Sequence, residues 1–95
     1  MPGEPTVEYE IVTPEGVVAS GPAAEVIVPG SEGAFGVLPG HAPFASTITR
    51  GYLTVKSGGK AREYYVAGGF VLVRPDRVLV CVREGSPRET DPDAA

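Results

Sequence analysis

His41 carries the side chain best suited to acid–base or metal chemistry, and it is the only histidine in the chain. It stands between Gly40 and Ala42, and no second histidine, no cysteine and no serine paired with a base lies nearby in the sequence. A catalytic imidazole needs a partner that orients it, and a metal site needs two or three further ligands. We therefore expect a structural or interface role for His41, and we predict no catalytic, cofactor-binding or metal-binding residues.

The other residue types that could take part in chemistry also form no candidate site in the sequence. The glycine-rich segments 32–36 and 67–70 lack the Gly-Lys-Ser/Thr ending of a phosphate-binding loop, and neither begins a helix. The carboxylates are scattered, so no acid–base dyad can be named. Cys81 is the only cysteine, which excludes an internal disulfide, and we expect it to be a small apolar filler.

Residues 29–43 combine glycines and prolines with few large side chains. Glycine permits positive φ, and proline fixes φ and removes a backbone donor. Two interpretations remain open: a loop system that holds one surface in a fixed shape, or two tight turns around a short strand over 35–38. The first predicts that a valine at Gly33 or Gly36 introduces strain if either glycine needs a positive φ.

Composition and charge narrow the class of protein. Ninety-five residues with 42% hydrophobic and 21% charged side chains indicate one globular domain, with no apolar run long enough to span a bilayer and no visible signal peptide. The net charge of −4 is uneven: residues 1–49 hold six acidic and no basic residues, whereas 50–83 hold seven basic and two acidic. No basic segment interleaved with aromatics indicates nucleic-acid binding. The basic stretch either offsets the acidic half or faces an acidic partner.

Apolar residues alternate with period two at 7, 9 and 11, at 24, 26 and 28, and at 78, 80 and 82, which predicts half-buried strands. Turn signals predict hairpins at 57–60 and 74–77, and no window shows helical spacing. We predict an all-β domain over residues 1–84, either a two-sheet sandwich or a small barrel, with its aromatics mostly in strand or core positions. An acidic tail over 85–95 is expected to be disordered.

The chain resembles the epsilon subunit of the bacterial F-type ATP synthase over roughly residues 6–84. The resemblance is carried by VTPEG at 12–16, GSEGAFGVLPGHAP at 30–43, RG at 50–51, AGGF at 67–70 and the strand at 78–82. It implies a flattened two-sheet β-sandwich of about ten short strands. It also implies a non-catalytic central-stalk subunit of the rotor that binds the gamma subunit and the c-ring and helps to couple ion flow to ATP synthesis.

The same resemblance places the partners on the chain. It implies a c-ring contact through Ser31, Glu32, Gly33 and Ala34, and a gamma-subunit contact through His41, Ala42, Pro43 and Ser46. Family members often carry an acidic residue where this chain has Ala34, so Glu32 would have to supply that contact. Membrane contact is expected only through the complex, at the cytoplasmic face of the bacterial inner membrane. The ion, whether proton or sodium, is set by another subunit.

Family members usually continue into a two-helix hairpin that inhibits ATP hydrolysis and in some members binds ATP. The sequence shows no helical pattern before Ala95, so we expect a subunit without this inhibition and without an ATP site. A subunit whose hairpin was removed or lies on a separate chain is one alternative. A stand-alone β-sandwich that binds a ligand or another protein is a second, and an enzyme is the weakest.

Overall fold

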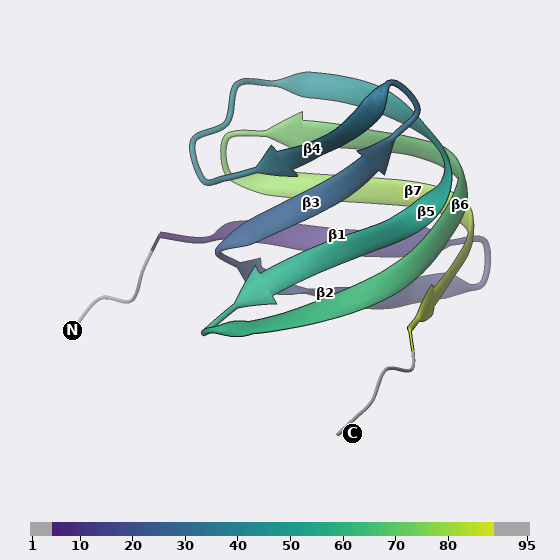
Figure 1. The fold of residues 1–95 in the computed structure, drawn as a ribbon, viewed down its shortest axis with the longest axis horizontal. Coiled ribbons are helices and arrows are strands. Elements are labelled where there is room, and N and C mark those ends of the chain that lie inside the picture. Colours follow the sequence, from purple (N-terminus) through teal and green to yellow (C-terminus); the bar gives the residue numbers. More distant parts are fainter. Residues whose placement is uncertain (1–4, 89–95) are drawn as a thin grey trace.

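The computed structural model describes residues 5–88, which form seven strands and no helix. Figure 1 shows them as one strongly curved sheet. The all-β prediction is confirmed, although the strands are fewer and longer than the ten expected. Their bounds are β1 (Val7–Thr13), β2 (Gly16–Ala23), β3 (Glu25–Gly30), β4 (Gly33–Val37), β5 (Phe44–Ser57), β6 (Lys60–Arg74) and β7 (Arg77–Pro87).

The seven strands pair in the order β2-β1-β7-β6-β5-β3-β4. All neighbours are antiparallel except β1 and β7, which run parallel although they lie near opposite ends of the chain. The sheet folds back on itself, so β3 and β4 lie in front of β7 and β1 in Figure 1. The two layers form the predicted sandwich.

β5 and β6 belong to both layers because they bend instead of ending. In β6, Gly68 has a φ of 73°, a left-handed value that glycine adopts without steric cost. Pairing with β5 and with β7 skips Gly68 and resumes at Gly69, so the strand changes direction within a continuous ladder. Segments that looked like separate short strands in the sequence are therefore halves of single long ones, which reduces the count to seven.

The core lies between the layers and consists mainly of valine. The predicted inward residues of β1 and β7 are buried, as are Val26 and Val28, whereas Ala24 is only half-buried. Burying such a side chain contributes about 1.5–3 kcal/mol. The buried residues are Val7, Tyr9, Ile11, Ala23, Val26, Val28, Val37, Ile48, Leu53, Val55, Tyr64, Val66, Val71, Val73, Val78, Val80 and Val82.

Both predicted hairpins are confirmed. Ser57 pairs with Lys60 across Gly58 and Gly59, whose φ values are 58° and 79°. Arg74 pairs with Arg77 across the second turn. Strand β7 continues to Pro87, three residues past the predicted domain boundary. Residues 89–95 of the predicted tail lie outside the described part of the chain.

One prediction about side-chain placement is wrong, because Cys81 is not a buried filler. Cys81 is partly exposed on the outer face of β7, opposite Phe70, because the inward positions of that strand belong to its valines. The aromatics do lie in strands, as predicted, but three of them are exposed. Phe44, Tyr52 and Phe70 are 48%, 48% and 45% exposed. The molecule therefore presents large apolar side chains to its surroundings as well as to its core.

Candidate functional site

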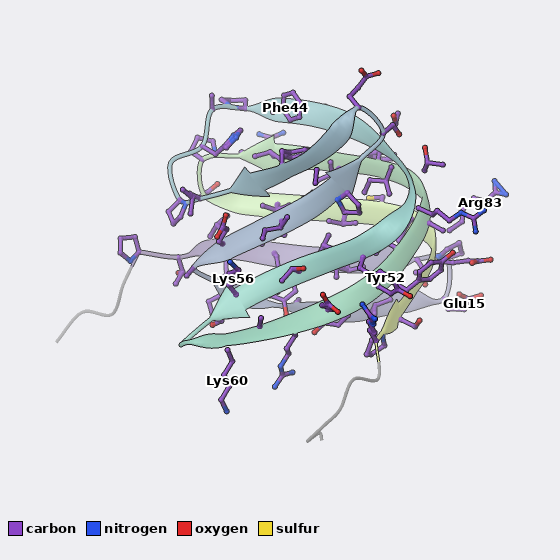
Figure 2. All side chains as sticks on the ribbon, in the orientation of Figure 1. Glu15, Phe44, Tyr52, Lys56, Lys60 and Arg83 are labelled. Carbon is purple, nitrogen blue, oxygen red and sulfur yellow. The ribbon has the colours of Figure 1, made fainter. Side chains whose placement is uncertain are left out.

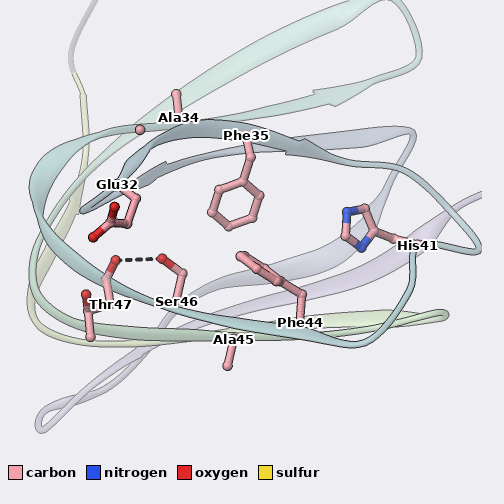
Figure 3. A pocket seen from close by; sticks show the side chains of 9 residues that line it. Glu32, Ala34, Phe35, His41, Phe44, Ala45, Ser46 and Thr47 are labelled. Atoms are coloured by element: carbon pink, nitrogen blue, oxygen red, sulfur yellow. Dashed lines mark hydrogen bonds between the residues drawn. The ribbon is translucent and has the colours of Figure 1, made fainter.

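A hollow of about 560 Å³ opens at one end of the sandwich, between the β3–β4 turn and the start of β5. Figure 3 shows its side chains. Within the segment 29–43, two turns flank the short strand β4, as the second interpretation predicts, and part of the segment lines this hollow together with the start of β5. The lining residues are Glu32, Gly33, Ala34, Phe35, His41, Phe44, Ala45, Ser46 and Thr47.

Two phenyl rings form the apolar centre of the hollow. Phe35 and Phe44 meet edge to face, with ring centroids 5.1 Å apart and an interplanar angle of 81°. The His41 ring lies 6.4 Å from the Phe44 ring. Edge-to-face aromatic pairs contribute about 0.5–1.5 kcal/mol beyond their buried area. Phe44 remains about half exposed, so its position is fixed while much of its ring is free to contact another molecule.

The turn 31–34 is tied to β5 by hydrogen bonds at its first residue. The Ser31 amide donates to the Thr47 carbonyl at 2.9 Å, and the Thr47 hydroxyl donates to Ser31 Oγ at 2.9 Å. Ser31 Oγ also lies 3.1 Å from Thr49 Oγ1. The four turn residues are exposed. The turn is therefore an anchored protrusion whose outer atoms are available for contact.

The glycines of this segment differ in their roles. Gly33 has a φ of 133° and open space around its Cα, so a side chain there would be strained by the backbone alone. Gly36 has no positive φ, and a Cβ there would lie 2.5 Å from Glu25 Oε2. Only Gly33 meets the positive-φ expectation, whereas Gly36 makes room for a glutamate side chain.

Backbone hydrogen bonds hold the loop 38–43. The Gly40 amide donates to the Pro75 carbonyl at 2.8 Å, and the His41 amide donates to the Leu38 carbonyl at 3.0 Å. His41 Nδ1 donates to the Ala42 carbonyl at 2.6 Å, since a carbonyl only accepts. The imidazole is thereby oriented by the backbone and not by a catalytic partner. Leu38, in the same loop, is 54% exposed.

A second hollow of about 610 Å³ adjoins the first and shares Phe44 and Ala45 with it. It also contains Pro43 and Leu72. Ala45 pairs with Leu72, which pairs with Leu79, so apolar side chains continue across the outer faces of β5, β6 and β7. We call Ala45, Phe70, Leu72 and Leu79 the outer apolar surface. Phe44 pairs with buried Val73 and points from the opposite face into the first hollow, toward Phe35 (Figure 3).

The structure brings the two predicted contact sets together. Glu32, Gly33 and Ala34 line the same hollow as His41 and Ser46. Ser31 anchors the turn beside it, and Pro43 lines the second hollow. Ala42 is exposed and lines neither of these two hollows.

Phe70 and Leu72 were missed as surface residues by sequence reasoning. Their signal was the run Phe70-Val71-Leu72-Val73, which is apolar on both faces. Because Val71 and Val73 are buried, the alternate residues must point outward. A strand that is apolar on both faces indicates that both faces are covered by other protein when the molecule is assembled.

The arrangement suits contact with another protein better than chemistry. Within residues 5–88, no group of three or more His, Cys, Asp or Glu side chains is placed to hold a metal ion. The same residues contain no helix long and apolar enough to cross a membrane. Clustered exposed apolar side chains beside anchored polar turns are typical of protein interfaces.

Two relatives are similar to this chain in sequence over most of its length. It is 51% identical over 78 residues to the ATP synthase epsilon chain of Myxococcus xanthus, covering 82% of this chain and 57% of that protein. It is 45% identical over 80 residues to the ATP synthase epsilon chain of Rhodospirillum rubrum, covering 83% of this chain and 60% of the relative. The chain therefore spans somewhat more than half the length of these relatives.

Solved structures share the fold. A chain in the cryo-EM structure of the Euglena gracilis mitochondrial ATP synthase (OSCP/F1/c-ring) superposes with a TM-score of 0.80 at 26% identity, covering 92% of this chain and 57% of that one. A chain in the central stalk/c-ring structure of the Tetrahymena thermophila mitochondrial ATP synthase matches with a TM-score of 0.70 at 12% identity, covering 88% and 68%, which shows the fold alone.

The family model of the ATP synthase delta/epsilon chain β-sandwich domain matches residues 6–87, nearly the whole of the described structure. This match agrees with the curved sandwich, the glycine-rich turn and the relatives above. The chain therefore belongs to the family of ATP synthase delta/epsilon chain β-sandwich domains.

Proposed function

We propose that this chain is a non-catalytic central-stalk subunit of the rotor in a bacterial F-type ATP synthase, where it binds the gamma subunit and the c-ring. The observation that carries the proposal is the outer apolar surface beside the anchored turn 31–34. The names of the relatives support the assignment to an ATP synthase, and the titles of both solved assemblies name the c-ring.

We assign the two partners to different parts of this end. The turn 31–34 is exposed, polar and held from below, so it suits the polar loops of a c-ring. Phe44 and Leu72 are exposed and apolar and border His41, Pro43 and Ser46, so they suit a gamma subunit that buries its contact permanently. Glu32 replaces the acidic contact expected at position 34. An exposed ion pair contributes only about 0–1 kcal/mol, so attachment would rest mainly on shape and apolar contact.

The role places mechanical demands on the domain that the fold meets. β5 and β6 pass through both layers, so shear between the layers must deform two continuous hydrogen-bonded strands. The close-packed valine core resists the same deformation. The subunit would transmit torque as a stiff body at the cytoplasmic face of the inner membrane, held there through the complex. It would not itself bind ATP.

The test is the affinity of the chain for its cognate gamma subunit, measured by calorimetry with and without ATP. We expect tight binding that ATP does not change, and a dissociation constant at least tenfold higher for Phe44→Ser. Val17→Ser is the matched control, because Val17 is 58% exposed on β2, outside both hollows. Absence of binding by the unmodified chain would overturn the proposal and favour a stand-alone β-sandwich module. If both variants weaken binding to the gamma subunit equally, the gamma contact does not lie at Phe44.

A further inference from the structure

The end of the sandwich opposite the turn 31–34 carries two cationic side chains on its inward face. Along β6, Lys60, Arg62, Tyr64 and Val66 share one face by alternation, and the last two are buried in the core. The side chains on this face of β6 therefore change from apolar to cationic where β5 and β6 extend beyond the core. Figure 2 shows Lys60 at the tip of this hairpin, far from Phe44.

These cations border a hollow of about 250 Å³ between β1, β2 and the β5–β6 hairpin. Its lining contains three hydroxyl-bearing residues and no carboxylate. The lining residues are Tyr9, Ser20, Gly21, Pro22, Val55, Ser57, Lys60 and Arg62.

Neither cation has an acidic partner among residues 5–88. The ion pairs in that range are Lys56–Glu25 at 3.8 Å and Arg88–Glu63 at 2.9 Å, and they involve other side chains. The hollow that contains Arg77 also contains Glu10 and Asp76, and the adjoining hollow that Arg62 lines contains Glu63, which pairs with Arg88. Lys60 and Arg62 are both exposed, on the side of β6 that carries Tyr64 and Val66 nearer the core, so they bring positive potential to the rim of this hollow in a chain whose net charge is −4.

A buried hydroxyl forms the inner wall of this hollow. Tyr9 is 8% exposed and lines this hollow together with Arg62. Tyr9 and Arg62 also line an adjoining hollow of about 410 Å³. A guanidinium, an ammonium and phenol or serine hydroxyls are the donors that bind tetrahedral oxyanions in proteins.

We propose that the hollow between β2 and the β5–β6 hairpin is a binding site for a phosphate group, held by Arg62 and Lys60 with hydroxyl donors from Ser20 and Ser57. Its volume lies below the range typical of sites for drug-sized ligands, which favours a single phosphate over a whole nucleotide. The site lies away from the outer apolar surface, so it is independent of the proposed rotor contacts.

The experiment is a nitrogen-15 NMR titration of the chain with inorganic phosphate at pH 7, with sodium chloride holding the ionic strength constant. We expect saturable shifts of the amides of residues 9, 20, 57 and 60–64, and a dissociation constant at least tenfold higher for Arg62→Gln. Arg77→Gln is the matched control and should bind as the unmodified chain does. Circular dichroism in chloride buffer checks that both variants fold.

A second arm repeats the titration with glycerol 3-phosphate. Equal affinity shows that the phosphate group alone is recognised. Tighter binding with added shifts at the amides of residues 18, 19 and 88 shows that the natural ligand carries its phosphate on a larger molecule that reaches the adjoining hollow. Both results support the site. The site would be overturned by shifts that do not saturate with phosphate, or by an unchanged dissociation constant for Arg62→Gln. It would also be overturned if a glutamate peptide saturated the shifts and phosphate did not.

Discussion

Tyr9 and Tyr64 bring two phenol hydroxyls into a core otherwise made of aliphatic side chains. They are 8% and 5% exposed, and the Tyr64 side chain lies close enough to act on the pKa of Tyr9. A buried hydroxyl without a hydrogen bond costs about 1–3 kcal/mol, so placing two hydroxyls near each other lowers the cost of burying them. The two tyrosines therefore link β1 to β6 across the interior and close the core at the end where the cationic hollow begins.

This pair predicts an alkaline loss of stability. Burial raises the pKa of Tyr9 from 10.0 to about 12, and the neighbouring Tyr64 side chain acts in the same direction. Between those values the unfolded chain releases the Tyr9 proton while the folded chain retains it, so the free energy of unfolding falls as pH rises from about 10 to about 12 and is unaffected below. Urea midpoints measured from pH 8 to pH 12 should show this decline.

Tyr9→Phe should flatten the decline while lowering stability at pH 8 by about 1 kcal/mol, because a polar contact inside the core is removed. Tyr52→Phe, at an exposed tyrosine, should keep the original slope. If Tyr9→Phe declines as steeply as the unmodified chain, another group is responsible for the alkaline transition.

Gly33 and Gly36 lie in one short segment, but each position favours glycine for a different reason. Gly33→Ala should lower the free energy of unfolding by about 1–2 kcal/mol, because the backbone at φ 133° disfavours any Cβ. Gly36→Ala should cost less, because its Cβ would meet the terminal oxygen of Glu25, a flexible side chain that can move aside. Urea denaturation of both variants decides the order, and a larger loss at Gly36 would show that Glu25 is fixed in place.

At the scale of elements, the bend in β6 joins the two layers. Gly68 supplies the left-handed φ, and Gly69 supplies the space, since a Cβ on Gly69 would collide with the Cys81 carbonyl on β7. Because the obstacle is backbone within a sheet, it cannot move without breaking the β6–β7 ladder. The Gly68-Gly69 pair thus performs two tasks that a single glycine could not.

Gly69→Ala should therefore be among the most damaging small substitutions, with a loss of roughly 3 kcal/mol or more. Gly85→Ala is a matched control on β7, because its Cβ would find only ordinary contacts of 3.4–3.5 Å with Thr13, Val18 and Val82 side chains. Thermal melts of both variants test the difference. Similar melting temperatures would mean that β6 and β7 separate more readily than their pairing suggests.

Alternation in the sequence was sufficient to predict the inward faces of β1 and β7 and both hairpin turns, since each depends on neighbours a few residues apart. It could not predict that β5 and β6 bend instead of ending, because glycine pairs mark a break in regular pairing without showing whether the chain turns back. The contact residues in 31–34 and 41–46 follow from the family resemblance and stay predictions, whereas residue types alone singled out the glycine- and proline-rich segment 29–43. Phe70 and Leu72 were missed because an apolar residue in a strand is ordinarily assigned to the core.

At the scale of the whole molecule, the last strand closes on the first. β1 pairs with β7 in parallel, with Ile11 opposite Val80, so some seventy residues of chain must be ordered between them. β5 and β6 are instead joined by a tight hairpin that places Ile48 opposite Gly69. Closing a long loop costs more entropy than closing a short one, so the hairpin can form before β1 docks.

This order of events predicts opposite kinetic signatures for one substitution at two buried sites. Ile11 is fully buried and Ile48 is 3% exposed, so Ile→Val at either should lower stability by about 0.5–1.5 kcal/mol. Stopped-flow measurements over a range of urea concentrations should show Ile11→Val mainly accelerating unfolding, because its contacts form after the transition state, and Ile48→Val mainly slowing folding. The reverse assignment would mean that β1 and β7 meet early, and the parallel pair rather than the bent hairpin would then organise the fold.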